Sequence, residues 1–326
     1  MLRGRRILVT GGAGYIGSHA VRFLCDRGAD VTVLDSLYAG HRAAVDRRAS
    51  LRVGDVRDPE AVAKAMAGTE AVMHFAALSL VGESVRERER YLDVNVGGTT
   101  CLAREAARQS VRAFVLSSTA ATYGEDVALP ITERQARRPC NPYGESKVAA
   151  EDVLSTAPFP AVFLRYFNAA GAMPDGSIGE DHRTETHLIP LAIAAATGRR
   201  PPLTVFGADW PTPDGTCVRD YVHVLDLVDA HLLALEHLLG GRGGGAFNLG
   251  TGTGSSVREV LRAVGEAMGV AVPHFDGPRR DGDPPSLVAS PQKARDVLGW
   301  TATRDLRTIT EDAWRWHRNH PDGYDD

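Results

Sequence analysis

A glycine-rich turn near the N-terminus restricts the fold of this chain more than any other stretch. The segment "ILVTGGAGYIGSH" places Gly12, Gly14 and Gly17 in a G-x-G-x-x-G pattern, directly after a short β-branched run. An apolar stretch with helical spacing follows. Small residues let the backbone approach a pyrophosphate, and a helix N-terminus favours its negative charge. The segment therefore predicts a strand, a phosphate-binding turn and a helix.

An acidic residue at the end of the next predicted strand completes this pattern. Asp35 follows Gly17 by 18 residues, at the end of "ADVTVLD". A carboxylate there accepts hydrogen bonds from the adenosine ribose hydroxyls and repels a 2′-phosphate. We therefore expect NAD rather than NADP. Asp55 and Val56, after the third predicted strand, are expected near the adenine edge, and an ordinary strand-end aspartate is the alternative for Asp55.

Strand and helix patterns alternate through the first half of the chain. Short apolar runs at 6–10, 29–35, 50–55, 71–77 and 111–118 predict strands, and 15–28 and 91–109 predict helices. This alternation is typical of βαβ units in an α/β protein with a Rossmann-type, doubly wound parallel sheet. We predict an NAD-binding domain over 1–165 and a smaller C-terminal α/β substrate domain over 166–326. Some segments of the second domain are expected to cross back to the first.

Composition and charge exclude several classes of protein. The 326 residues carry a net charge of -4 without a run of five like charges, which argues against a nucleic-acid or membrane partner. The longest late apolar stretch, "LIPLAIAAA", is far shorter than the roughly 20 residues that span a bilayer. The four cysteines are far apart, and no Cys/His spacing is typical of a zinc site. We expect a cytoplasmic protein with free thiols and no metal.

A tyrosine and a lysine lie one helical turn apart in "NPYGESKVAAE". Asn141 suits a helix N-cap and Pro142 its first position, so Tyr143 and Lys147 share one helix face. Such a pair is by itself common on protein surfaces. Removing a hydride from a carbinol carbon also requires removing the hydroxyl proton, and a free tyrosine with a pKa of about 10 is a poor base at neutral pH. We expect the Lys147 ammonium and a cationic nicotinamide to lower the pKa of Tyr143.

Further motifs resemble those of the extended short-chain dehydrogenase/reductase family, and more narrowly its UDP-glucose 4-epimerases. The resemblance runs nearly end to end, and its most specific parts are "LRYFNAAGA", "DGTCVRDYVHV" and "RRDGD". It implies an NAD enzyme of galactose metabolism that epimerises UDP-glucose and UDP-galactose at C4 through a 4-keto sugar. It also implies a homodimer formed through two long helices, at about 91–109 and 143–156.

The resemblance implies roles for the matching positions of this chain. Thr119, Tyr143 and Lys147 match the catalytic hydroxyl, the base and the lysine that holds the cofactor ribose. The cofactor positions are Gly11, Gly14, Tyr15, Ile16, Gly17, Asp35, Ser36, Asp55, Val56, Phe75, Ala76, Ala77, Ser79, Asn95, Ser117, Tyr143, Lys147 and Tyr166. The UDP-sugar positions are Thr119, Tyr143, Asn168, His187, Leu188, Val205, Phe206, Arg219, Tyr221, Arg280 and Asp283.

Two of these positions also follow from elementary chemistry. Guanidinium groups bind phosphate oxygens bidentately, so Arg219 and Arg280 suit a diphosphate. A solvated surface charge is the alternative for either arginine.

A few positions separate this chain from its neighbours in the family. Ala120 and Ala121 follow Thr119, where nucleotide-sugar 4,6-dehydratases usually have Asp-Glu, and elimination of water needs an acid and a base. This argues against dehydration. Ser79 replaces a lysine of some members. Leu287 occupies the position linked to tolerance of N-acetylated sugars, and its size does not decide that tolerance.

Other functions stay open on the sequence alone. The enzyme alternatives are 4-epimerisation of a UDP-N-acetylhexosamine, UDP-pentose or UDP-hexuronate, and a net dehydrogenase that releases NADH. A non-catalytic dinucleotide sensor would belong to a different class. A sensor would be expected to lose Tyr143 or Lys147, and both are present.

Overall fold

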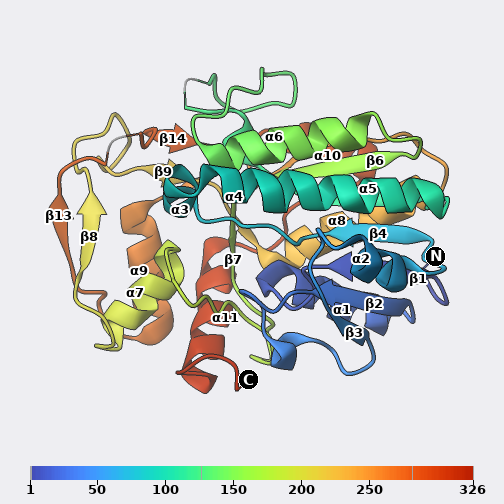
Figure 1. Cartoon of the computed structure of the whole chain (residues 1–326). Coiled ribbons are helices and arrows are strands. Elements are labelled where there is room, and N and C mark those ends of the chain that lie inside the picture. The colour runs from blue at the N-terminus through green and yellow to red at the C-terminus, as the bar shows by residue number, and fades with distance from the viewer. Residues whose placement is uncertain (1, 126, 281, 326) are drawn as a thin grey trace.

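The computed structural model describes residues 2–125, 127–280 and 282–325, and a seven-stranded parallel sheet forms its centre (Figure 1). The strand order is β11-β6-β5-β4-β1-β2-β3, which is a Rossmann sheet with one added edge strand. This confirms the predicted fold class. The strands are β1 (Arg6–Thr10), β2 (Asp30–Asp35), β3 (Ser50–Val53), β4 (Ala71–His74), β5 (Ala113–Thr119), β6 (Ala161–Tyr166) and β11 (Gly245–Leu249).

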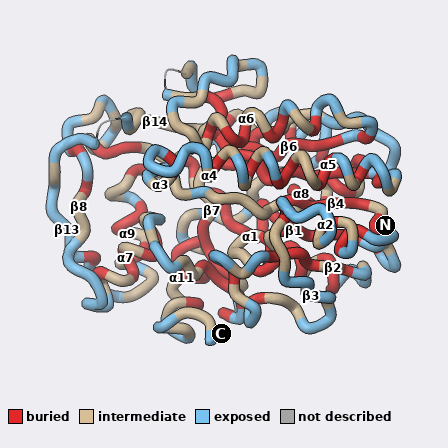
Figure 2. The backbone as a smooth tube through the Cα atoms, in the orientation of Figure 1, coloured by how far each residue is buried: buried red, intermediate tan, exposed pale blue. Residues whose placement is uncertain are grey.

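Helices cover both faces of this sheet, which is why its strands are continuous apolar runs. One face packs against α1 (Tyr15–Asp26), α8 (Val224–Leu239) and α10 (Gln292–Leu298). The other face packs against α2 (Pro59–Met66), α5 (Gly98–Arg108) and α6 (Pro142–Ser155). Figure 2 shows the buried chain concentrated in the sheet between these helices.

A smaller lobe of helices and short sheets stands beside the carboxyl end of the large sheet. Its core lies between α7 (Leu188–Ala196), α9 (Val257–Met268) and α11 (Leu306–Asn319). The short sheets pair β7 (Asn168–Ala170) with β10 (Tyr221–His223) and β8 (Leu203–Phe206) with β13 (His274–Gly277). A third contains β12 (Ser255–Ser256), β9 (Val218–Arg219) and β14 (Ser286–Leu287).

Segments late in the chain return to the large sheet. β11 pairs with β6 in parallel register, and α8 packs against the same sheet face as α1. The division of the chain at residue 165 stays a prediction, and β11 and α8 are the segments that lie with the first half.

The helix predicted over 91–109 is interrupted. α4 (Arg88–Leu92) passes through a π-helical turn at Asp93–Gly97 before α5 begins. The wider turn contains the buried Asn95, whose amide bonds the backbone of a neighbouring loop. Gly98 follows, and a Cβ there would lie 2.6 Å from a methyl of Val56. Such turns are frequent at functional sites.

The structure also bears on membrane-spanning helices and on the state of the cysteines. Among the residues described, no helix is both long and apolar enough to cross a bilayer. Cys25, Cys101, Cys140 and Cys217 are all free thiols.

Candidate active site

The glycine-rich turn forms a cradle between β1 and α1. Gly11 has a φ of +72°, and a Cβ there would lie 2.4 Å from the backbone nitrogen of Ala76. A Cβ on Gly17 would lie 2.1 Å from the carbonyl oxygen of Gly11, so the helix approaches the turn as closely as backbone allows. Gly14 is the N-cap of α1. The turn therefore fits a pyrophosphate at a helix N-terminus.

Asp35 lies at the end of β2 with its carboxylate fixed beside this turn. It accepts hydrogen bonds from the backbone nitrogens of Ala13 at 2.9 Å and Leu37 at 2.8 Å. Burial raises the pKa of this carboxyl group. Each carboxylate oxygen has a further lone pair, so Asp35 can still accept from ribose hydroxyls.

Asp55 and Val56 follow β3 with different surroundings. The guanidinium of Arg57 binds Asp55 and also reaches Asp93 at 2.5 Å, and it holds the pKa of Asp55 below its usual range. Val56 is buried against Gly98. The side chain of Asp55 is thus engaged in a half-exposed ion pair, and its expected position near the adenine edge stays a prediction.

The other residues of the cradle differ in where their side chains point. The Tyr15 hydroxyl donates to the carbonyl oxygen of Gly171 at 2.6 Å, and so reaches the segment that follows β7. Ile16 packs against the core. Ser36 is exposed, and its hydroxyl accepts from the backbone of Tyr38 at 3.3 Å. These side chains line or support the turn rather than converge on one point.

A loop after β4 is held in place by Asn95. Its amide oxygen accepts from the nitrogen of Leu78 at 2.8 Å, and its amide nitrogen donates to the Leu78 carbonyl at 3.0 Å. The same nitrogen donates to the hydroxyl of Ser146 on α6 at 2.8 Å. Asn95 therefore connects the loop, the π-helical turn and α6. The predicted loop positions are Phe75, Ala76, Ala77 and the exposed Ser79.

The predicted catalytic residues meet where β5, β6 and α6 approach one another. Asn141 caps α6 by accepting from the nitrogen of Gly144 at 2.9 Å, as predicted. Lys147 is buried, and its amine donates to the carbonyl oxygen of Ser117 at 3.0 Å. The Ser117 hydroxyl bonds the hydroxyl of Tyr166, and Tyr143 bonds Thr119. Side chains 49 positions apart thus form one buried cluster.

Burial decides the proton affinities of this cluster in the protein chain itself. It raises the pKa of Tyr143 to about 12, and the hydrogen bond from Thr119 opposes this effect. Burial also lowers the pKa of Lys147 to about 8, with Glu151 opposing. In the surroundings that the chain provides, desolvation of the phenolate outweighs the Thr119 contact. The expected lowering of the Tyr143 pKa depends on a cationic nicotinamide as well, and it stays a prediction.

Two buried residues of the same region escaped the sequence analysis. Glu151 accepts from the Arg165 Nε at 2.8 Å and from the Ser118 hydroxyl at 2.6 Å. Arg165 also donates to the hydroxyl of Tyr123 at 2.9 Å. Helical spacing could have predicted Glu151, because it lies four residues after Lys147 and therefore on the same helix face as Tyr143 and Lys147.

Four of the predicted UDP-sugar positions form two pairs on the smaller lobe. The Arg219 guanidinium reaches Asp283 at 3.4 Å and donates to the carbonyl of Pro284 at 2.9 Å. The Arg280 guanidinium lies 4.3 Å from the ring centroid of Phe206, which is partly exposed. Each pair presents a cationic group, and the second adds an aromatic face that suits a nucleobase.

The remaining predicted positions lie around these pairs. Asn168 and Tyr221 are partners in the register of β7 and β10, and burial raises the pKa of Tyr221 to about 12. Val205 is buried next to Phe206, and His187 and Leu188 begin α7. Leu287 is the register partner of Arg219 on β14, so it lies at the same edge.

Asp220, between Arg219 and Tyr221, also escaped the sequence analysis. It is fully buried and accepts from the backbone nitrogens of Thr251 at 2.7 Å, Gly252 at 3.1 Å and Ala289 at 3.2 Å. The carboxylate therefore joins the segment next to Arg219 to the "LGTG" turn and to the segment that follows β14. The sequence indicated Asp220 only by its position directly after Arg219 in "VRDYV".

Comparisons with known proteins show which chains are similar to this one. Residues 7–250 match the model of the NAD dependent epimerase/dehydratase family. The UDP-glucose 4-epimerase of Lacticaseibacillus casei is 49% identical over 98% of this chain and 99% of that protein. The Brucella ovis UDP-glucose 4-epimerase in complex with NAD superposes with a TM-score of 0.92 at 45% identity, covering 95% of this chain and 98% of that one. The Bifidobacterium longum enzyme in complex with NAD+ and UDP gives 0.91 at 35% identity, covering 98% and 100%.

Proposed function

This chain belongs to the NAD dependent epimerase/dehydratase family, and from that premise we propose that it interconverts UDP-glucose and UDP-galactose by epimerisation at C4. The observation that carries this proposal is the cluster of Thr119, Tyr143, Lys147 and Tyr166, in which Tyr143 is half-buried and the other three are buried. It lies at the end of the strands that follow the glycine cradle. The UDP-glucose 4-epimerases of Lacticaseibacillus casei, Lactobacillus helveticus and Bifidobacterium longum each match most of the chain and bear this activity in their names.

The chain's own residues suit NAD as the resident cofactor. Bound NAD supplies the acceptor and donor of the C4 hydride. Gly11, Gly14 and Gly17 would hold its pyrophosphate, and Asp35 would accept from the adenosine ribose. The buried ammonium of Lys147 would hold the other ribose from the side of α6. These assignments are supported by the close backbone packing of the turn and by the fixed carboxylate beside it.

Tyr143 would move the proton of the substrate. Its phenol lies beside Thr119, which would hydrogen-bond the O4 oxygen and align it. Tyr143 would take the O4 proton as the 4-keto sugar forms and return it after the sugar has turned about its diphosphate link. The Thr119 hydrogen bond favours the phenolate, which is the charged form that this step requires.

The smaller lobe would hold the part of the substrate that does not react. Arg219 and Arg280 would bind the diphosphate and uridine portion, with Phe206 under the base and Asp283 near the uridine ribose. Anchoring the nucleotide leaves the sugar free to present either face of C4. The engagement of Arg219 with Asp283 and of Arg280 with Phe206 supports this division of roles.

The turn after Thr119 favours epimerisation over dehydration. Ala120 and Ala121 form the start of a short 3₁₀ turn, whose nitrogen at Ala121 donates to the Thr119 hydroxyl. Neither side chain carries a carboxyl group. An elimination of water would therefore have no acid at the positions that follow the catalytic threonine.

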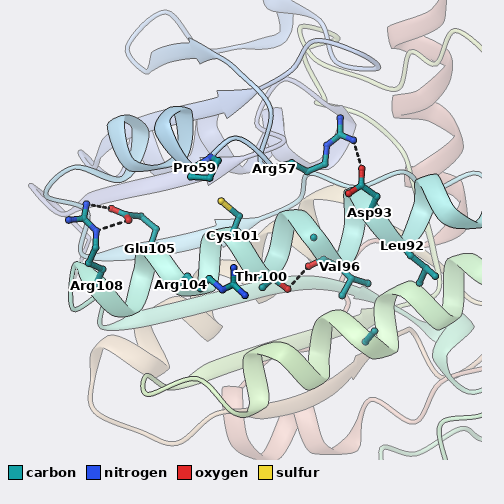
Figure 3. Close-up of a pocket in the computed structure, with 12 residues that line it drawn as sticks. Arg57, Pro59, Leu92, Asp93, Val96, Thr100, Cys101, Arg104, Glu105 and Arg108 are labelled. Atoms are coloured by element: carbon teal, nitrogen blue, oxygen red, sulfur yellow. Dashed lines mark hydrogen bonds and ion pairs between the residues drawn. The ribbon is translucent and has the colours of Figure 1, made fainter.

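We also propose a homodimer through α5 and α6. A groove runs along α5, where half-buried apolar side chains of Leu92, Val96 and Cys101 face outwards with Ala149 of α6. In Figure 3, the pair of Arg57 with Asp93 lies at one end of this groove and that of Glu105 with Arg108 lies at the other. A second copy would cover the apolar centre and leave these charges at the rim.

The free thiols favour a cytoplasmic location.

A proton NMR time course with UDP-galactose and no added cofactor tests the activity. Growth of the UDP-glucose anomeric signal to a stable mixture is expected, because the enzyme keeps its NAD through the cycle. Turnover only after NAD is added would leave the chemistry intact and refute tight retention. If UDP-galactose stays unchanged even with NAD, the substrate assignment is wrong.

A further inference from the structure

We propose that Glu180, His182, Glu185 and His187 form a binding site for a divalent transition metal of the zinc type. The four side chains belong to one eight-residue segment that leads into α7. One ligand atom of each lies within 4.8 Å of the ligand atoms of the other three. The proposal does not rest on the epimerase activity.

The distances between the donor atoms match those around a single ion. His182 Nδ1 lies 3.3 Å from Glu185 Oε2 and 3.4 Å from Glu180 Oε1. His187 Nδ1 lies 3.8 Å from Glu185 Oε1 and also contacts Glu180 Oε1. Bonds of about 2.0–2.2 Å in a tetrahedral zinc site put neighbouring ligand atoms about 3.3 Å apart. His182 therefore already lies at tetrahedral spacing from both glutamates, whereas His187 and Glu180 are in direct hydrogen-bond contact and would have to move apart to hold an ion between them.

The ligand types suit the same ion. Two imidazoles and two carboxylates are acceptable to zinc, cobalt and nickel, and two carboxylates neutralise a divalent charge. The four residues have the spacing Glu-x-His-x-x-Glu-x-His, which contains no cysteine. No metal was predicted from the sequence, because only Cys/His spacings typical of zinc sites were considered.

The surrounding structure orients these side chains. Glu185 accepts from the backbone nitrogens of Thr186 and His187, both at 2.7 Å, which holds the turn before α7. Glu180 is 4% exposed, and its backbone carbonyl accepts from the indole of Trp316 at 3.1 Å. His187 is the half-exposed member and leaves the cluster open to solvent. The segment is thus held in place on its buried side and accessible on the other.

Ion pairs between protonated histidines and the glutamates are the competing explanation. Two imidazole nitrogens converge on the same oxygen of Glu180. A proton bridges two atoms at a time, whereas one metal ion would contact all four donors together. Uptake of cobalt by the native sequence therefore separates the two explanations.

The position of the cluster gives a bound ion a structural consequence. The ring of His182 lies edge-on to that of Tyr15, with 6.4 Å between centroids and 89° between planes. Tyr15 is the first residue of α1, directly after the glycine cradle. A bound metal would therefore restrict the motion of the segment before α7, which contacts the first residue after the glycine-rich turn.

Cobalt titration of the tag-free, full-length enzyme tests the site. After treatment with chelator and dialysis, the enzyme is expected to take up about one Co²⁺ per chain, with the strong visible absorption of tetrahedral coordination. Zinc should displace the cobalt and remove the absorption. Zinc should also raise the melting temperature. Absence of the tetrahedral spectrum in the native sequence overturns the proposal, whatever the variants do.

Variants distinguish this site from adventitious binding. H182N and E185Q are each expected to weaken cobalt binding about tenfold or more, since each removes a charged or basic ligand. H274N is the matched control, because His274 is exposed on β13 and bonds only the carbonyl of Val272 among the contacts described. Circular dichroism of each metal-free variant verifies folding. Unchanged cobalt binding in folded H182N and E185Q, or an equal loss in H274N, also overturns the proposal.

Discussion

Glu151 and Arg165 form a two-fold hydrogen-bonded ion pair, with exposures of only 1% and 5% for the two side chains. Glu151 lies on α6 one turn after Lys147, and Arg165 lies on β6 next to Tyr166. The pair therefore fixes the catalytic helix against the strand that carries another member of the cluster. Removing one partner would leave an uncompensated buried charge, which is costly.

We expect Glu151→Ala to lower the free energy of unfolding by about 3–5 kcal/mol, because Arg165 would remain buried without its carboxylate. Urea denaturation followed by circular dichroism measures the change. Asp152→Ala is the matched control, since Asp152 is exposed and pairs with Arg137 at the surface. The control should change stability by about 0.5 kcal/mol or less. Equal effects of the two variants would contradict a structural role for the buried pair.

We expect Tyr143→Phe to reduce the rate of epimerisation by a factor of about 10²–10⁴ while the fold is kept, because the variant lacks the group that moves the O4 proton. The NMR time course gives the rate, and circular dichroism checks the fold. Tyr38→Phe removes an equivalent hydroxyl from an exposed position, so this variant should keep full activity. A fully active Tyr143→Phe variant would refute the assignment of the base.

Lys147→Met should separate catalysis from stability. Burial lowers the folded-state pKa of Lys147 to about 8, from 10.5 in the unfolded chain. Below pH 8 the lysine is protonated in both states, so the full cost of burying its charge lowers the free energy of unfolding. Between pH 8 and 10.5 the unfolded chain binds more protons than the folded chain, so this cost disappears as the pH rises towards 10.5. The variant should therefore be inactive without being less stable at pH 7. Its advantage over the native sequence should shrink at pH 10 in urea denaturation. A variant that is clearly less stable at pH 7 would contradict the cost of burying this ammonium.

Gly17→Ala is expected to release NAD, because the added methyl would lie 2.1 Å from the carbonyl oxygen of Gly11 and push α1 away from the cradle. The overpacking should also cost about 1–3 kcal/mol of stability. Nucleotide released on denaturing a gel-filtered sample, measured by its absorbance, gives the retained cofactor. Gly82→Ala places a methyl in open space on α3 (Val81–Arg86) and should retain NAD as the native sequence does.

Three buried histidines should make the protein sensitive to mild acid. Burial lowers the pKa of His19 to about 4, of His74 to about 3 and of His231 to about 4. Below pH 6.5 the unfolded chain binds protons at these positions and the folded chain does not. Stability should therefore fall as pH decreases, by about 1.4 kcal/mol per pH unit for each histidine.

Urea denaturation between pH 6.5 and 5 measures this slope. His231→Leu should make the slope shallower, because the variant has lost one of the histidines whose pKa burial lowers, a group that also includes His317. His274→Asn, which changes an exposed histidine, should leave the slope unchanged. A slope that stays the same in His231→Leu would show that other groups cause the acid sensitivity.

The sequence by itself determined the features whose causes lie within one turn or one βαβ unit. The strand, glycine turn and helix at 6–26, the acid at Asp35 and the Asn141 cap depend on residues that are close along the chain. The sheet type followed from the alternation of such units. The pairing of Tyr143 with Lys147 on one face followed from helical periodicity alone.

Tertiary structure decided the features that depend on segments far apart in the sequence. β11 joins the large sheet because residues 245–249 find the open edge of β6, which no local pattern indicates. The π-helical turn places Asn95 against a loop 17 residues away. In the chain's own surroundings the pKa of Tyr143 is raised, because burial, which the whole fold creates, outweighs the hydrogen bond of Thr119. Periodicity and capping act over a few residues, whereas desolvation and strand pairing arise only when the complete chain has packed.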